Sequence, residues 1–249
     1  MIRVQPASDS LERLVPDQLD QRDTTGRATL ELHLARYRFA AGLLRPGRVL
    51  DIACGVGYGS RVLAAAGRDV EVLGVDLSAQ AVEYARTHYA GPDIEFRVGD
   101  ALAFEDADGF DSIVSLETVE HVPDPGAFVA RLGRLLRPGG TLIASVPTTP
   151  SVDLNPHHLH DFTERSFRDL VAGRAPGLAE VEALRQVQPL PVLPVLRRSE
   201  TRLGDLRNNL GSYYASHPGA LLRRMLATLR YGLTNRYVTI AWRGAGAGA

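Results

Sequence analysis

The chain has 249 residues, 45% of them hydrophobic and 23% charged, with a formal net charge of -1. A chain of this length can bury about 70 to 75% of its unfolded surface, so we expect one elaborated domain that needs neither disulfides nor a structural metal to fold. Its single cysteine, Cys54, excludes a disulfide framework within the chain, the absence of lysine excludes a Schiff base, and the near-neutral charge argues against a dedicated nucleic-acid-binding protein.

The N-terminal part of the sequence predicts a helix in front of the main fold. The first ten residues, MIRVQPASDS, lack the apolar core of a signal peptide, and no stretch approaches the ~20 apolar residues needed to span a bilayer, so we expect a cytoplasmic protein. Residues 27–44 carry apolar groups at helical spacing. They predict an amphipathic helix that caps one edge of a sheet.

Apolar runs alternate with helical stretches between Arg48 and Val187, and this alternation is typical of a doubly wound, Rossmann-like α/β sheet. The predicted strands are 48–53, 70–76, 94–99, 110–116 and 141–147, and the predicted helices are 57–66, 79–90 and 124–137. Ser78 is placed to cap the second helix, and the Arg-Pro-Gly-Gly sequence at 137–140 is placed to end the third.

Two further strands are predicted near the C-terminus, at 181–187 and 236–242. They are expected to pair antiparallel and to complete a seven-stranded, mostly parallel sheet with helices on both faces. The segment between them is rich in proline and arginine and predicts a basic helical insertion. The expected division is a helical cap at 1–47, a core at 48–187, the insertion at 188–235, and a last strand with a disordered tail at 236–249.

The most informative segment is VLDIACGVGYGS at 49–60, where a strand runs into a glycine-rich loop and then a helix. Such a loop alone fits many nucleotides. Asp51, near the end of the strand, would repel a pyrophosphate by on the order of 4 kcal/mol at about 4 Å, so a cationic ligand is the better partner. Asp76 ends the next strand, where its carboxylate can accept both hydroxyls of a ribose. The loop therefore favours a ribose-containing cation over a dinucleotide.

Further motifs follow in order: Gly99-Asp100-Ala101, SLETVEHV at 115–122 and LLRPGGTLIASVP at 135–147. With the glycine loop they resemble the class I S-adenosylmethionine-dependent methyltransferases, most closely the small bacterial enzymes that act on small molecules and glycans. The resemblance covers residues from about 27 to 187. One departure is Ala53, where many relatives have glycine, and we expect it to leave the loop intact but slightly tighter.

This resemblance implies a site for S-adenosylmethionine. Asp51 and the loop backbone would hold the methionine end, and Asp76 would bind the ribose. Asp100 with the Ala101 amide would recognise the adenine, and Glu117 would lie beneath the sulfonium. The residues that the resemblance places in the site are Arg36, Tyr37, Asp51, Ala53, Gly55, Gly57, Asp76, Leu77, Asp100, Ala101 and Glu117. Arg36 and Tyr37 would close over the methionine carboxylate, although surface residues of an amphipathic helix would look the same.

The loop after the fifth predicted strand, residues 148–162, gathers three of the seven histidines: His157, His158 and His160. It leaves the carboxyl edge of the sheet, where ligands bind in open α/β folds. Because neutral histidine accepts a proton near pH 7, we predict that one of the three is a general base for a hydroxyl acceptor. The alternative is that these side chains only fix the loop through hydrogen bonds.

The same loop has potential metal ligands. Glu117, Glu120 and His121 are expected nearby, and a divalent ion such as magnesium is one possibility, although the mixture of nitrogen and oxygen donors assigns no particular ion. His121 is a further candidate catalytic residue, which would orient the cofactor or the acceptor. A structural role for His121 is equally open.

Residues 218–233 predict a basic amphipathic helix. We expect a lid over the acceptor pocket, and if its arginines face inward the acceptor would be anionic. Two alternatives are a helix that lies on an anionic membrane and one that merely covers a core.

Together these features predict O-methylation of a small molecule, with a sugar or glycan hydroxyl as the preferred acceptor. The alternatives are a phenol, quinone-type or other natural-product acceptor, and a non-catalytic S-adenosylmethionine-binding partner. Nucleic acid is not expected, because Cys54 lies in the cofactor loop and residues 116–119 lack the motif of amino-directed nucleic-acid methyltransferases. A homodimer is left open.

Overall fold

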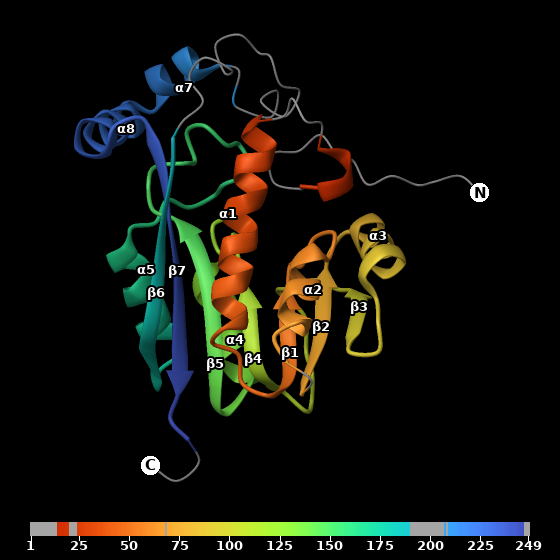
Figure 1. The fold of residues 1–249 in the computed structure, drawn as a ribbon. Helices are drawn as coiled ribbons and strands as arrows, with labels where there is room; N and C mark the ends of the chain where they lie inside the picture. The colour runs from red at the N-terminus through yellow and green to blue at the C-terminus, as the bar shows by residue number, and fades with distance from the viewer. Residues whose placement is uncertain (1–13, 20–23, 68, 190–206, 208, 247–249) are drawn as a thin grey trace.

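A computed structural model describes residues 14–19, 24–67, 69–189, 207 and 209–246. The seven strands are β1 (Gly47–Ile52), β2 (Val70–Asp76), β3 (Ile94–Val98), β4 (Phe110–Ser115), β5 (Leu136–Pro147), β6 (Leu178–Pro189) and β7 (Thr234–Gly244). They form one sheet in the order β3-β2-β1-β4-β5-β7-β6. All neighbouring pairs are parallel except the two that involve β7, which runs antiparallel between β5 and β6 (Figure 1). The predicted Rossmann-like fold and the antiparallel pairing near the C-terminus are confirmed.

Helices cover both faces of this sheet. The helices are α1 (Thr24–Ala41), α2 (Tyr58–Ala64), α3 (Ala79–Tyr89), α4 (Pro125–Leu135), α5 (Glu164–Arg174), α7 (Leu210–Ser216) and α8 (Pro218–Tyr231), with a short 3-10 turn η1 (Pro16–Gln18). Ser78 caps α3 by accepting a hydrogen bond from the Ala81 amide, as the sequence predicts. Helix α2 begins one residue later than predicted, because Gly57 has a left-handed φ of 87° that a helix does not tolerate.

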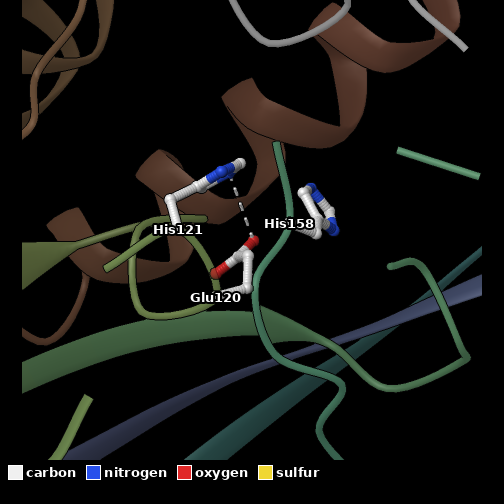
Figure 2. A group of neighbouring side chains, drawn as sticks. All are labelled: Glu120, His121 and His158. Carbon is white, nitrogen blue, oxygen red and sulfur yellow. Dashed lines mark ion pairs between the residues drawn. The ribbon is translucent and has the colours of Figure 1, made fainter. Parts of the chain in front are cut away.

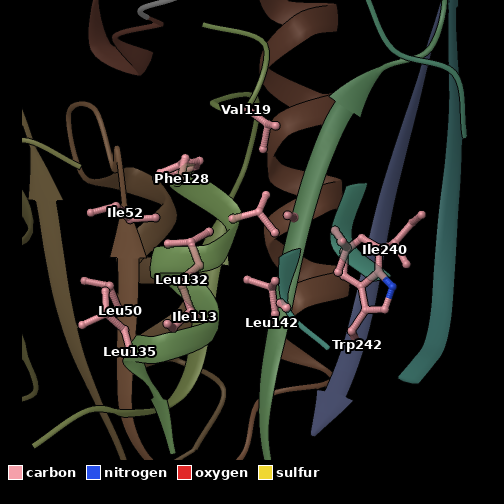
Figure 3. Packing of buried hydrophobic residues seen from close by; sticks show 14 of the residues in the cluster. Leu50, Ile52, Ile113, Val119, Phe128, Leu132, Leu135, Leu142, Ile240 and Trp242 are labelled. Carbon is pink, nitrogen blue, oxygen red and sulfur yellow. The ribbon is translucent and has the colours of Figure 1, made fainter. Parts of the chain in front are cut away.

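One core lies between the sheet and the helices α4 and α5. Phe128 and Leu132 of α4 pack against Leu50 of β1 and Leu142 of β5, and Trp242 of β7 extends the same cluster (Figure 3). All of these side chains are almost fully buried. Burial of each large apolar side chain contributes about 1.5 to 3 kcal/mol, so this face fixes the sheet on which the site is built.

The second core corrects the expected position of the N-terminal helix. Tyr37 and Ala40 of α1 pack with Val49, Ile143 and Ala241, which come from strands in the middle of the sheet. Figure 1 accordingly shows α1 lying across one face of the sheet. The helix does not cap an edge, because its apolar stripe is wide enough to cover three strands.

Two other sequence expectations were wrong in detail. The Arg-Pro-Gly-Gly segment at 137–140 belongs to β5, because Leu136 already pairs with Phe110 and the strand continues through an irregular register. Helix α5 was not predicted, although Thr163 and Ser166 form a capping box at its start and Phe167 and Val171 are buried at helical spacing.

The C-terminal insertion is described only in part. Residues 190–206 and 208 lie outside the described residues, whereas α7 and α8 confirm its helical character. The expected tail falls partly on 247–249, which also lie outside the described residues. The strands β6 and β7 belong to the same sheet as the core, and the expected division into four segments stays a prediction.

Candidate functional site

A pocket of about 230 Å³ lies at the carboxyl ends of β1, β2 and β4, and the middle of α1, which carries His33 and Arg36, forms its opposite wall. The lining residues come from these strand ends, from α1 and from the glycine loop: Leu14, His33, Arg36, Tyr37, Ala53, Cys54, Gly55, Val56, Tyr58, Asp76, Leu116 and Glu117. Six of the eleven residues that the resemblance places in a cofactor site are therefore brought together here. They are Arg36, Tyr37, Ala53, Gly55, Asp76 and Glu117.

The loop between β1 and α2 is built from left-handed backbone. Ala53, Gly55 and Gly57 have φ values of 60°, 58° and 87°. A Cβ on Gly55 would meet nothing within 4 Å, so this backbone faces the pocket, whereas a Cβ on Gly57 would lie 2.7 Å from the Ala85 side chain. Gly57 therefore allows the loop to pack on α3 and does not line the pocket. The effect of Ala53 is larger than the slight tightening expected from the sequence. Its left-handed conformation costs about 1 to 2 kcal/mol for a residue with a Cβ.

Asp51 lies beneath the loop and not on the wall of the pocket. Its carboxylate accepts hydrogen bonds from the Ser60 hydroxyl at 2.6 Å and the Tyr37 hydroxyl at 3.3 Å, and only 1% of the residue is exposed. Burial raises the pKa of Asp51 to about 7, although both hydroxyl groups act in the opposite direction. The expectation that Asp51 presents a full negative charge to the ligand is corrected, because the fold uses this carboxylate to tie α1 and α2 to β1.

Asp76 shapes the loop and faces the pocket at the same time. One carboxylate oxygen accepts the Gly55 amide and the other accepts the Ser78 amide, each at 2.9 Å. The residue is 8% exposed and lines the pocket. The next side chain, Leu77, is 72% exposed and lies outside the lining.

Arg36 is the one cationic side chain among the residues that line the pocket, and it is 1% exposed. Its Nε donates to Gln186 at 2.8 Å, its guanidinium lies 4.4 Å above the Tyr237 ring, and one terminal nitrogen lies 3.7 Å from Glu117. Glu117 has a left-handed φ of 49° and is held by Ser145, whose hydroxyl donates to its carboxylate at 2.7 Å. Arg36 is buried, so the alternative that it is a surface residue of an amphipathic helix is wrong.

The residues expected at the adenine lie apart from this pocket. Asp100 is exposed, and its carboxylate accepts the Leu102 amide at 2.9 Å to close a turn at the end of β3. Neither Asp100 nor Ala101 lines the pocket. The Gly99 amide donates to the Asp76 carbonyl, so this turn adjoins the pocket wall at β2. Adenine recognition by Asp100 and Ala101 stays a prediction.

Sequence reasoning missed His33 and Tyr58, whose side chains meet at 2.9 Å in the pocket wall. Burial, assisted by the positive charge of Arg36, lowers the pKa of His33 to about 3, so this histidine is neutral near pH 7. The signal was present, because His33, Arg36 and Tyr37 lie at helical spacing on one face of α1. Cys54 also lines the pocket, and burial raises the pKa of its thiol, so it is not a thiolate nucleophile.

The loop at 148–162 is called the acceptor loop below. Its three histidine side chains do not meet at one point. His157 is exposed, and the Nε2 of His160 donates to the Val122 carbonyl at 3.0 Å, which is a structural contact. His158 lies 2.7 Å from the Ser151 hydroxyl and turns toward His121, with the two ring centres 4.6 Å apart. Burial, followed by the charges of His121 and His157, lowers the pKa of His158 to about 3.

His158 and His121 form a cluster with Glu120, shown in Figure 2. One ligand atom from each residue lies within 4.8 Å of the others, and Glu120 is fully buried. The Nδ1 of His121 lies 3.1 Å from the His157 carbonyl, which can only accept, so Nδ1 carries a proton. Two imidazoles and one carboxylate suit zinc better than magnesium. Glu117, expected among these ligands, is instead paired with Arg36 and Ser145.

Helix α8, expected to be a lid, is anchored to the loop at 148–162 by a buried ion pair. Arg224 of α8 pairs with Asp153 and also donates to the Pro150 carbonyl, and the Tyr214 hydroxyl donates to Asp153 at 2.7 Å. Although burial raises the pKa of Asp153, the hydrogen bonds from Arg224 and Tyr214 hold it below its ordinary value. Arg224 is thus committed to the fold and does not offer its charge to an anionic acceptor.

Comparison with known proteins agrees with this geometry. Residues 50–144 match the family of methyltransferase domains. A ubiquinone biosynthesis O-methyltransferase of Xanthomonas axonopodis pv. citri is 38% identical over 120 residues, which is 46% of this chain and 49% of the relative. One from Bordetella avium is 39% identical over 118 residues, 46% of this chain and 48% of the relative. The chain thus spans about half the length of the curated relatives it matches.

Solved structures extend the likeness over nearly the whole chain. The N-methyltransferase NodS from Bradyrhizobium japonicum, solved with S-adenosyl-l-homocysteine, has a TM-score of 0.58 and 16% identity, with 90% of this chain and 89% of that chain covered. The cyclase SpnF has a TM-score of 0.60 and 15% identity, with coverage of 92% and 86%. At this identity the likeness establishes the fold alone, and the two reactions differ. Residues 50–144 therefore match a methyltransferase domain, and they lie within a chain whose fold is similar to that of solved methyltransferases.

Proposed function

We propose that this protein transfers a methyl group from S-adenosylmethionine to a ring hydroxyl of a phenol or quinone-type small molecule. The observation that carries the proposal is the charge arrangement of the pocket. Asp76 ends β2 and Glu117 follows β4, on either side of β1, and Arg36 stands opposite them on α1. A ligand with a carboxylate, a positively charged centre and a ribose is complementary to this arrangement, whereas a pyrophosphate is not.

Each pocket residue would contact a different part of S-adenosylmethionine. Arg36 is the partner for the carboxylate of the methionine moiety, because it is the cation of the lining and can donate from both terminal nitrogens. Asp76 accepts from the ribose hydroxyls, and Glu117 supplies negative charge toward the sulfonium. Gly55 brings bare backbone next to the ligand. Asp51 acts through Ser60 and Tyr37 by holding the loop in place.

Bound S-adenosylmethionine supplies an electrophilic methyl on a positively charged sulfur. The chain has to align the acceptor oxygen in line with that methyl and to accept the hydroxyl proton. A phenol has a pKa near 10, far below that of a sugar hydroxyl, so a weak base is sufficient. The His121 and His158 pair is suited to this role, since the two ring centres lie 4.6 Å apart and His121 Nε2 lies 4.0 Å from the Glu120 carboxylate.

The relatives favour this acceptor over the sugar or glycan predicted from the sequence. The matched relatives are named as ubiquinone biosynthesis O-methyltransferases, and none of those that we compare is named for a carbohydrate. A metal-assisted variant is compatible with the same residues. Glu120, His121 and His158 would hold a divalent ion, which would lower the pKa of a bound hydroxyl.

The test is transfer of an isotope-labelled methyl group to a matched panel of soluble acceptors: catechols and hydroxylated benzoates on one side, simple sugars and nucleotide-linked sugars on the other. We expect label on the phenolic oxygens. Label on the sugars alone would replace the acceptor, and tight cofactor binding with no transfer to either set would leave a binding module. Treatment with a chelator, followed by zinc or magnesium, separates the metal-free and metal-assisted forms.

The cofactor assignment has its own control. Asp76→Ala should weaken S-adenosylmethionine binding by roughly 10- to 100-fold, since charge-assisted hydrogen bonds contribute about 1.5 to 3 kcal/mol. Asp69→Ala, at an exposed position just before the opposite end of β2, should leave the affinity unchanged. Equal affinities for the two variants in calorimetry would remove Asp76 from the ribose site.

A further inference from the structure

Helix α8 turns its apolar face away from the rest of the molecule. Its large apolar side chains are 39 to 82% exposed. They are Leu221, Leu222, Met225, Leu226 and Leu229, with Leu233 just after the helix. At about 100° per residue these positions span one continuous face of the helix. Scattered exposed leucines are ordinary on a protein surface, but a continuous face of this kind marks an interaction site.

The orientation of this face is fixed by contacts on the opposite side of α8. Ala220 is buried, and Arg224 is held by Asp153 and by the Pro150 carbonyl in the acceptor loop. Both residues lie on the side of the helix opposite Leu222 and Leu229. The buried ion pair therefore prevents α8 from rolling its leucines inward, and the helix does not merely cover a core.

The charged side chains of the segment that carries this face are of one sign. From Leu206 to the end of the sequence there is no aspartate or glutamate. The charged side chains of this region are all arginines: Arg207, Arg223, Arg224, Arg230, Arg236 and Arg243. Arg223 and Arg230 are exposed along one border of the apolar face, and Arg223 lies 3.9 Å from Asp161. Leucines bordered by arginines complement a surface that is anionic outside and apolar below.

We propose that α8 is a docking helix for an anionic lipid surface. The leucines enter the boundary between headgroups and acyl chains, and Arg223 and Arg230 contact the acidic headgroups. No helix among the described residues is long and apolar enough to cross a membrane, so the contact is interfacial. Only the biological role of this docking rests on the proposed function. An apolar ring acceptor carried in the lipid would be delivered next to the acceptor loop that anchors α8.

The position of α8 supports that delivery. In Figure 1 the helix lies at the end of the molecule toward which the parallel strands point, the same end as the pocket. Arg224 joins α8 to Pro150 and Asp153, which follow closely after the carboxyl end of β5.

The experiment is flotation of the full chain with vesicles of phosphatidylcholine alone or of phosphatidylcholine with phosphatidylglycerol. We expect binding to the anionic vesicles only, and weaker binding at high salt. The variant Leu226→Gln/Leu229→Gln should lower the partition coefficient at least tenfold, and Arg223→Gln/Arg230→Gln should lower it severalfold. The matched control is Val181→Gln, which changes an apolar side chain of 47% exposure on β6 and should bind like the parent chain.

Methyl transfer to a soluble acceptor is measured on the same variants, so that the two proposals fail separately. Loss of vesicle binding in the leucine variant, with full methyl transfer to the soluble acceptor, supports the docking helix. Vesicle binding by the parent chain without any methyl transfer would contradict only the proposed function. Binding that is equal for neutral and anionic vesicles, or equal for the leucine variant and the control, overturns the docking helix. So does a stable dimer, measured by light scattering, that dissociates in the leucine variant while vesicles are ignored.

Discussion

The cofactor pocket and the acceptor side of this protein are assembled in different ways. Apart from the wall contributed by α1, the pocket is formed by strand ends and the loops that follow them directly, and its acidic groups Asp76 and Glu117 come from two strand ends. The acceptor side joins the turn at 117–121, the loop at 148–162 and the helices at 210–231 through side-chain contacts. Local motifs therefore identify the first region, whereas the second depends on which distant segments meet.

The largest expected effect tests whether the acceptor side is chemical or only structural. His121→Asn and His158→Asn should lower kcat by roughly 100- to 10,000-fold, the usual contribution of general acid-base catalysis, with little change in S-adenosylmethionine affinity. The control is His157→Asn, because His157 contacts His121 through its backbone carbonyl and its ring is exposed. Full activity in both test variants would leave the cluster with a structural role.

The next effect concerns the buried ion pair of the pocket. Arg36→Met leaves Glu117 without its cation at 3.7 Å, so we expect the free energy of unfolding to fall by about 3 kcal/mol. Arg38→Met is the matched control, since Arg38 pairs with Glu31 on the surface, where such pairs contribute less than about 1 kcal/mol. Urea denaturation of both variants measures the difference, and equal stabilities would contradict the assigned network.

The pH dependence of stability should carry two opposing contributions from the pocket. His33 has its pKa lowered from 6.5 to about 3, so its contribution to stability is complete above pH 6.5 and is lost as the pH falls toward 3. Asp51 has its pKa raised from 3.8 to about 7, so the folded state binds a proton that the unfolded chain has released. Its contribution is present below pH 3.8 and is lost as the pH rises through about 7.

Two variants separate these contributions in denaturation curves recorded between pH 4 and pH 8. His33→Gln should flatten the fall in unfolding free energy on acidification, by at most about 1.4 kcal/mol per pH unit. Asp51→Asn should act in the opposite direction and steepen that fall. Parallel profiles for the two variants would disprove the assigned shifts.

The smallest expected effect is at Ala53, which holds a left-handed φ of 60°. Ala53→Gly should raise the free energy of unfolding by about 1 kcal/mol, because glycine adopts this conformation without strain. Ala130→Gly within α4 is the control of opposite sign and should cost about 1 kcal/mol. A loss of stability in both variants would mean that Ala53 is not strained.

Much of the fold was predictable because short sequence patterns determine where its strands and helices begin and end. The limits of β2 were predicted correctly, and those of β1, β3 and β4 to within one residue, since each is a short apolar run with glycine or aspartate at one end at least. The start of β5 was missed, because its Arg-Pro-Gly-Gly segment has turn residues whose strand pairing depends on Phe110 from another strand. Helix α1 was found, but its place on a sheet face depends on partners that follow it by up to two hundred residues.

The sequence by itself determined the class of fold, the glycine loop and the acidic residues at the strand ends, because these features recur at fixed short spacings set by the backbone. The tertiary structure alone decided that Asp51 is buried beneath the loop, that Arg36 faces Glu117, and that His121 meets His158. It also turned the leucines of α8 outward, through the ion pair of Arg224 with Asp153. Burial and charge pairing act between segments far apart in the chain, and only folding brings those segments into contact.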